Sequence, residues 1–244
     1  MNLRRRGRRL LLLAGAALAA CQLAPVAEPG SDAAPAGHSS AAAWAALYTQ
    51  RAAAGGRLFT IDPRQSSVRI LVFRGGRAPG LGHNHVLAAP DFVGYCLLPP
   101  SGAGDARFDL EFRLDALELD RPALRAALGP PFAAELTPGD VANTRAHMLG
   151  EDNLQASRFP YVRIHGLQVT GEGSAYAARL AVELHGQTRE AWVPLTVEGL
   201  PGHLAVSGSW VLRQSDFGVR PYSALGGLIA VQDEILLQFR LVAD

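Results

Sequence analysis

The regular alternation of apolar and charged residues in one segment most strongly constrains the fold of this chain. Every second residue of the segment 108–114 is apolar: Phe108, Leu110, Phe112 and Leu114. The residues between and after them are charged: Asp109, Glu111, Arg113 and Asp115. Successive side chains of a β-strand point to opposite faces of the sheet. The spacing therefore predicts a strand with one buried face and one solvated face.

Other segments of the chain have similar strand-like patterns, and Gly- or Pro-containing turns separate most of them. They cover residues 67–73, 161–169, 179–186, 190–199, 203–214 and 234–242. Antiparallel strands that alternate in this way must close into a barrel or pair as two sheets. We therefore expect an all-β fold, an antiparallel barrel with an apolar lumen.

The middle of the chain has a different pattern. Residues 120–129 predict a short helix, with Pro near its start and Gly after its end. Residues 138–150 predict another, with Asp140 as its N-cap and apolar contacts from Val141 and Met148. A short helical insertion is therefore expected within the barrel.

The N-terminus has the features of a secretory signal peptide. Five arginines precede an apolar run at 10–18, which is shorter than the roughly 20 residues that a membrane span needs. Leu18-Ala19-Ala20-Cys21 resembles the lipobox of bacterial lipoproteins, in which the cysteine is acylated and becomes the new N-terminus. Because Gln rather than Asp follows, we expect a lipid-anchored protein of the periplasm, on the outer membrane. An ordinary signal peptide with a chance cysteine is the alternative.

An Ala- and Pro-rich segment separates this signal from the barrel. We expect residues 1–20 to be the lipoprotein signal peptide, 21–57 a tether, and 58–244 the barrel domain. Residues 41–54 could form a helix inside the tether, with Trp44, Leu47 and Tyr48 on one face. That face could lie on the membrane, although docking on the barrel is the simpler expectation.

The charge of the processed chain excludes one class of function. Five of the 23 basic residues lie in 1–20, which leaves 18 against 22 Asp and Glu. Such a mildly acidic protein is not expected to bind nucleic acid. If Cys21 carries lipid, Cys96 has no disulfide partner in the chain and is expected to be a buried structural thiol.

The segment Gly-His-Asn-His at 82–85 holds the most notable polar residues. If this segment is extended, His83 and His85 point to the same side. Zinc sites take three or four protein ligands, and the later histidines lie far away in sequence. We therefore interpret the pair as polar residues beside a pocket, and a metal site is the alternative. The wider spacing of the HNH nuclease motif excludes that assignment.

Other candidate binding residues lie in the second half of the chain. Arg220 and Tyr222 follow Gly218 on an expected loop, where they could contact a ligand oxygen. Arg213 and Asp216 are expected to form a salt bridge that fixes the turn after the strand. Hydrolase chemistry has little support, because the chain has no Gly-x-Ser-x-Gly motif and no spacing that assembles a catalytic triad.

Five stretches together resemble the YceI-like family, in the correct order. They are FTIDPRQSSVRILVFR, NLQASRFPYVRIHG, LAVELHGQTREAWVPLTVE, VLRQSDFGV and VQDEILLQFRL, and the resemblance covers about residues 58–242. It implies an extended, lipocalin-like antiparallel β-barrel that holds a polyisoprenoid or an isoprenoid quinone. It also implies a periplasmic or exported protein, of a family for which no catalytic activity is established at large, and a possible homodimer, since YceI-like proteins often pair. This chain departs from many relatives in its lipobox and its histidines, although a subset resembles it with Gly-His-Asp-His.

The resemblance and the pattern together predict a periplasmic carrier of an isoprenoid lipid, a quinone or a similar amphiphile. No enzyme activity and no cofactor are expected. The predicted ligand-binding residues are His83, His85, Arg220, Tyr222, Phe112 and Trp210. The alternatives are a metal- or redox-linked stress protein that uses the two histidines, and a structural envelope lipoprotein whose barrel is filled by its own side chains.

Overall fold

The computed structural model describes residues 37–244. The predicted signal peptide, Cys21 and the first part of the predicted tether lie outside the described residues. Within 37–244, no helix is long and apolar enough to cross a membrane.

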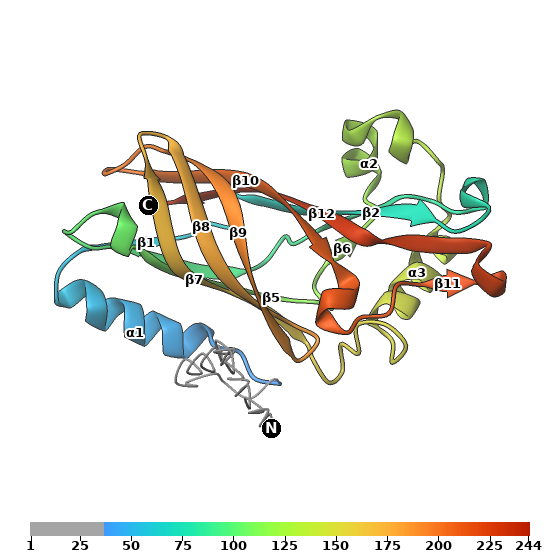
Figure 1. Cartoon of the computed structure of the whole chain (residues 1–244), viewed down its shortest axis with the longest axis horizontal. Coiled ribbons are helices and arrows are strands. Elements are labelled where there is room, and N and C mark those ends of the chain that lie inside the picture. Colours follow the sequence, from blue (N-terminus) through green and yellow to red (C-terminus); the bar gives the residue numbers. More distant parts are fainter. Residues whose placement is uncertain (1–36) are drawn as a thin grey trace, which may run out of the picture. The chain divides into compact units, whose positions relative to one another are not determined.

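The described chain forms one antiparallel sheet of 12 strands (Figure 1). The strands are β1 (Arg57–Thr60), β2 (Ser67–Gly75), β3 (His85–Ala88), β4 (Val93–Leu98), β5 (Arg107–Arg113), β6 (Glu118–Leu119), β7 (Tyr161–Glu172), β8 (Ala175–Leu184), β9 (Gln187–Glu198), β10 (Leu204–Arg213), β11 (Ser223–Ala224) and β12 (Ile229–Ala243). The spatial order is β1-β4-β5-β7-β8-β9-β10-β12-β2-β3-β6, and β11 pairs with β12. The predicted all-β class is confirmed.

The sheet curls into a half-barrel in which β12 connects the two ends of the fold. Its C-terminal half pairs with β10 on one side and β2 on the other. A single bridge from Ile61 to Ala243 brings the start of the sheet back to the end of β12. On the side of β12 opposite β10, the sheet continues with β2, β3 and β6. The barrel is thus drawn together near the C-terminus, and it is extended by the second group of strands.

The predicted helical insertion is confirmed. It contains α2 (Pro122–Leu128) and α3 (Pro138–Leu149). The N-cap of α3 is Thr137 rather than the predicted Asp140. Asp140 is the third residue of the helix, and it completes a capping box because its carboxylate accepts a hydrogen bond from the Thr137 backbone N–H. Short 3₁₀ turns are η1 (Pro79–Leu81), η2 (Ala103–Asp105), η3 (Pro130–Phe132), η4 (Gln214–Phe217) and η5 (Leu225–Gly227).

The helix expected in the segment before the barrel is α1 (Ala41–Ala53), and it docks on the outer face of the sheet. Trp44 and Tyr48 are buried there against Leu97 of β4. Leu47, which the sequence placed on the same face, is 36% exposed. The docked face is therefore narrower than expected and is set by the two aromatic residues.

One predicted ion pair is wrong. Arg213 pairs with Glu234 of β12 at 3.2 Å rather than with Asp216. Because Glu234 is the cross-strand partner of Arg213 in the β10–β12 register, the two side chains meet on one face of the sheet. The turn at η4 is instead tied to β12 by Ser215, whose backbone N–H donates to Asp233 at 2.8 Å.

Candidate ligand-binding interior

An inner cavity of about 150 Å³ lies in the part of the half-barrel near the C-terminus. Its wall comes almost entirely from the inward positions of the strands, including Phe59, Leu110, Val193 and Leu204. Cys96 also lines it, and burial raises the pKa of this thiol to about 12. The thiol is therefore protonated at neutral pH, which agrees with the structural role expected for it.

A larger outer cavity of about 670 Å³ adjoins the first one. Its volume falls within the range of about 300–1,000 Å³ that is typical of small-molecule sites. Strand residues such as Ile70 and Val182 form its apolar wall, and α3 covers part of it with Thr144 and Met148. Unlike the inner cavity, it also carries histidine and amide side chains.

Four side chains line both cavities and mark the place where they meet. They are Phe112, Ile164, Trp210 and Leu237. Each comes from a different strand, and all four belong to the interior face of the curled sheet. The two cavities therefore lie side by side within the curled sheet, and the lining of the inner one is much more apolar than that of the outer one.

The two histidines of the Gly-His-Asn-His segment both line the outer cavity, and Asn84 between them points elsewhere. The Asn84 side chain accepts a hydrogen bond from the Arg74 backbone N–H at 2.9 Å and donates one to the Pro131 carbonyl at 2.9 Å. It thus ties β2 to the helical insertion. This alternation is the one expected of an extended backbone.

His85 is held in place by a buried carboxylate. Its Nδ1 lies 2.6 Å from Oδ2 of Asp120, and the other carboxylate oxygen accepts from Arg125 at 2.7 Å and from the Val86 backbone N–H at 3.0 Å. The Asp120 side chain has no solvent exposure. Burial raises the pKa of Asp120, but the hydrogen bonds from His85 and Val86 and the nearby Arg125 outweigh it and hold the pKa below its usual value.

His83 lies in a different electrostatic environment. Partial burial lowers its pKa, and the nearby His85 and Arg125 lower it further. A neutral imidazole has one donor and one acceptor nitrogen. At neutral pH His83 can therefore either donate to or accept from an uncharged polar head group.

The other predicted residues are placed differently. Phe112, Trp210 and Tyr222 line the outer cavity together with the two histidines. The Tyr222 ring lies 5.2 Å from the ring of His147 on α3. Arg220 is exposed and does not belong to the lining; its carbonyl accepts a hydrogen bond from the Asn153 side chain at 2.8 Å. Ligand binding by these residues stays a prediction.

The metal alternative required a third ligand near the histidine pair. Within residues 37–244, no group of three or more His, Cys, Asp or Glu side chains is arranged to hold a metal ion.

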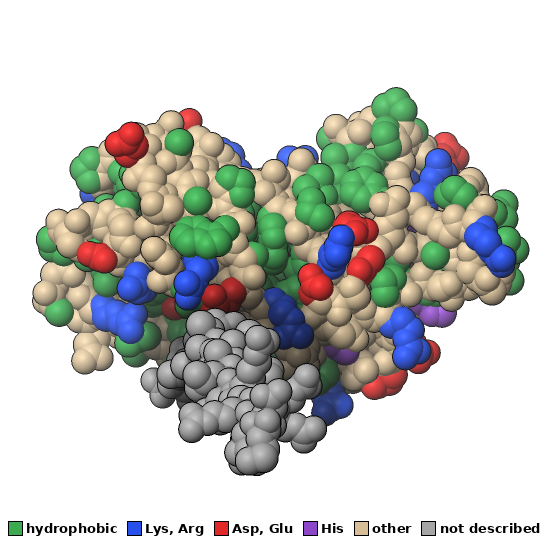
Figure 2. Space-filling view, in the orientation of Figure 1, with side chains coloured by type: hydrophobic (Ala, Val, Ile, Leu, Met, Phe, Trp, Pro, Cys, Tyr) green, Lys and Arg blue, Asp and Glu red, His purple; other side chains and the backbone are tan. Residues whose placement is uncertain are grey.

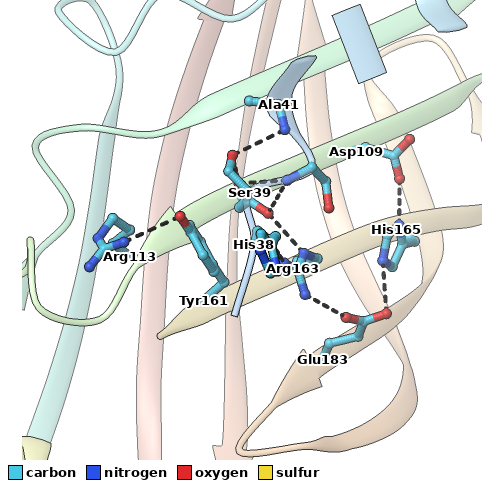
Figure 3. Close-up of polar contacts among 11 residues, drawn as sticks. His38, Ser39, Ala41, Asp109, Arg113, Tyr161, Arg163, His165 and Glu183 are labelled. Carbon is cyan, nitrogen blue, oxygen red and sulfur yellow. Dashed lines mark hydrogen bonds and ion pairs between the residues drawn. The ribbon is translucent and has the colours of Figure 1, made fainter. Parts of the chain in front are cut away.

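A polar network on the outer face of the sheet was not anticipated from the sequence (Figure 3). Arg163 of β7 donates to Glu111 of β5 at 2.8 Å, and both side chains are about 95% buried. Ser39 and the Ser40 backbone N–H also donate to Glu111, at 2.6 Å and at 3.0 Å to its nearer oxygen. The segment before the barrel therefore covers a charged pair that alternation had assigned to solvent.

His165 is the second centre of this network. Its two ring nitrogens lie 2.6 Å from Asp109 and 3.4 Å from Glu183. Burial lowers the pKa of His165, but the two carboxylates outweigh it and raise the pKa to about 9. Tyr48 of α1 donates to Asp109 at 2.8 Å, and the Trp44 ring meets the imidazole edge to face. The sequence does place opposite charges on segments that become neighbouring strands. The register that brings these charges together cannot be predicted from the sequence.

The comparisons agree with this architecture. A model of the YceI-like domain matches residues 59–243. The chain belongs to the YceI-like family. This membership supports a lipid-binding barrel, since the family is known for binding polyisoprenoids, and YceI-like proteins are binding proteins.

Solved structures of YceI-like proteins resemble the chain in fold. Burkholderia cenocepacia BcnA is 16% identical with a TM-score of 0.56, over 75% of this chain and 99% of BcnA. A YceI protein of Campylobacter jejuni is 12% identical with a TM-score of 0.45, over 62% of this chain and 80% of its own. No curated protein matches the sequence.

Proposed function

We propose that this protein sequesters or carries an isoprenoid lipid, an isoprenoid quinone or a similar amphiphile in the periplasm. In this proposal a lipid on Cys21 holds the protein at the outer membrane. The protein acts as a carrier and not as an enzyme.

The observation that carries the proposal is the arrangement of the two cavities, which share four wall residues and differ in polarity. An amphiphile has an apolar tail and a polar end, and the interior has the same polarity gradient, from Phe59 and Val193 in the inner cavity to His83 and His85 in the outer one. Each methylene group that leaves water for the apolar wall contributes about 0.8 kcal/mol. A long tail can therefore supply most of the affinity.

The head group would lie in the outer cavity, where hydrogen-bonding groups converge. His83 and Tyr222 reach the lining from separate turns, and α3 adds Asn143 and His147. His85 is already engaged with Asp120, so it contributes a fixed imidazole rather than a mobile one. A few positioned polar groups of this kind orient a ligand without supplying most of its affinity.

Native mass spectrometry of the full chain, purified gently from bacterial envelopes and followed by organic extraction, tests the proposal. The full chain is required because α1 covers buried charges of the barrel. We expect a co-purifying amphiphile, and its mass gives the tail length. A chain without an organic ligand but with one stoichiometric metal ion, lost in H83A, would contradict the proposal. A chain that holds neither would favour a structural envelope lipoprotein.

A further inference from the structure

Two turns meet at the end of the fold opposite α1 (Figure 1). Both turns carry exposed leucines. One turn follows β2 and contains η1, and the other joins β11 to β12 and contains η5. Residues 74–82 and 222–229 form this feature, which we call the leucine tip. Leu81 is 63% exposed, Leu225 is 68% exposed and Leu228 is 37% exposed.

The leucine tip is one ordered unit rather than two separate turns. The backbone N–H of Arg77 donates to the Gly227 carbonyl at 3.0 Å, and that of Ala78 donates to the Leu228 carbonyl at 2.9 Å. The Arg77 side chain donates to the Gly226 carbonyl at 2.8 Å. These hydrogen bonds join the backbones of the two turns that carry the three exposed leucines.

The charge of the leucine tip has a single sign. Its two segments contain Arg74 and Arg77 and no Asp or Glu. The carboxylates that follow on β12 are engaged elsewhere, because Asp233 accepts hydrogen bonds from Ser215 and Glu234 pairs with Arg213. Figure 2 shows apolar and basic side chains next to one another at the right-hand end of the molecule.

The leucine tip also borders the outer cavity. Leu81, Tyr222 and Ile229 belong to the tip and line the cavity at the same time. A residue such as Leu81, which is mostly exposed and still part of the lining, lies at the opening. The opening and the exposed leucines therefore face the same surroundings.

We propose that the leucine tip docks on a membrane surface with anionic head groups. Exposed apolar side chains flanked by arginines are the combination that holds peripheral proteins in the lipid interface, where the apolar groups enter the acyl boundary and the guanidinium groups meet phosphates. The exposed leucines share the two segments with Arg74 and Arg77 and with no carboxylate, and this charge complements an anionic lipid surface. This argument does not depend on the ligand.

Docking in this orientation would place the cavity opening against the bilayer. An amphiphile could then pass between membrane and cavity without crossing water. This consequence rests on the proposed function, whereas docking itself does not.

Tryptophan quenching by brominated lipids tests docking on the full chain. L225W introduces a reporter at the leucine tip, and V211W introduces one on β10, at a residue that is 56% exposed. Vesicles contain phosphatidylglycerol and phosphatidylethanolamine, with or without bromine on the acyl chains. The emission of each variant is compared with that of the parent chain. Any attachment through the N-terminus is common to both variants.

We expect the additional emission of L225W to fall at least about twofold on brominated vesicles, and that of V211W to stay unchanged. On phosphatidylcholine vesicles the quenching of L225W should fall at least about threefold, because the arginines lose their anionic partners. Equal quenching in the two variants would overturn the proposal. Quenching of L225W that is equal on anionic and on phosphatidylcholine vesicles would overturn the proposal as well. A blue shift of the L225W emission without vesicles would also overturn it, because it indicates that a second copy of the chain covers the leucine tip.

Failure of this test is distinguishable from failure of the proposed function. A chain that co-purifies with an amphiphile but shows no quenching of L225W is a carrier that does not dock through the leucine tip. A chain that shows quenching but holds no amphiphile docks on membranes for another purpose.

Discussion

Asp120 organises the residues around the Gly-His-Asn-His segment although it lies 35 positions further along the chain. It has a positive φ of 52°, a conformation that Asp and Asn tolerate better than most residues. Its carboxylate connects His85, Val86 and Arg125. The orientation of His85 in the cavity wall is therefore set by a residue of the helical insertion.

The variant D120N is expected to lower the free energy of unfolding by about 3 kcal/mol, because it leaves the buried Arg125 without its counter-charge. Asparagine keeps the shape of the side chain and tolerates the positive φ, so the loss reports on the charge. Urea denaturation followed by circular dichroism measures it. The control D115N removes a carboxylate from the exposed pair with Arg113 and should cost less than about 1 kcal/mol. Equal losses would contradict this account of Asp120.

His165 makes the stability of the fold depend on pH. Its pKa of about 9 in the folded chain exceeds the value of about 6.5 in an unfolded chain. Folding therefore favours the protonated imidazole. The resulting stabilisation is fully present below about pH 6.5 and is lost as the pH rises to about 9, with an upper limit of about 3 kcal/mol.

We expect H165Q to show a smaller loss of stability between pH 6.5 and 9 than the parent chain, as measured by chemical denaturation at several pH values. The control H203Q removes an exposed histidine that also pairs with a carboxylate, that of Asp244. H203Q should keep the pH dependence of the parent. If H165Q and the parent lose stability in parallel, another group is responsible.

At the scale of elements, α1 is the helix whose contacts join the N-terminal segment to the barrel. Its two buried aromatic side chains rest on β4 and the His165 side chain. The helix has no acidic residue in its first turn and no side-chain cap at Ser40. Its position therefore depends on packing and on the polar network under it rather than on strong local helix signals.

The variant W44A is expected to raise the rate of trypsin cleavage after Arg51 at least about tenfold. Removal of a buried Trp side chain costs about 3–5 kcal/mol, and part of this loss makes local opening of α1 easier. Mass spectrometry of the cleaved chain identifies the site. The control L47A alters the exposed side of the same helix and should leave the rate nearly unchanged. A similar rate in both variants would show that the docked aromatic face does not hold α1.

At the scale of the whole molecule, the two cavities connect parts of the sheet that are far apart in sequence. Phe112 and Ile164 come from neighbouring strands in the first half of the sheet order, and Trp210 and Leu237 come from β10 and β12. In the proposed function, the place where the cavities meet would limit how far the tail of the ligand reaches from the outer cavity into the inner one.

If the proposed ligand spans both cavities, I164W should shorten the co-purifying tail or reduce the bound fraction at least about twofold, because the larger ring would fill space where the two cavities meet. Organic extraction and mass spectrometry give the tail length. The control V211W adds the same ring on the outer face of β10. An unchanged ligand in I164W would show that the tail stays in the outer cavity.

Much of the fold was predictable from local pattern. The alternation at 108–114 predicted a strand whose inward residues Leu110 and Phe112 are buried, and the spacing of His83 and His85 predicted that both face one side. Side-chain direction in a strand follows from backbone geometry alone. The same reasoning assigned Glu111 to solvent and was wrong, because Arg163 and the segment just before α1, at Ser39 and Ser40, cover it.

The sequence by itself therefore determined the strands, the helical insertion and the family, because each depends on local periodicity or on a run of neighbouring residues. Only the tertiary structure decided that Asp120 holds His85, that Arg163 meets Glu111 under the N-terminal segment, and that the two turns of the leucine tip join. These contacts depend on strand register and on segments that are distant along the chain. Local pattern carries no record of them, since a one-residue shift in register would change every partner.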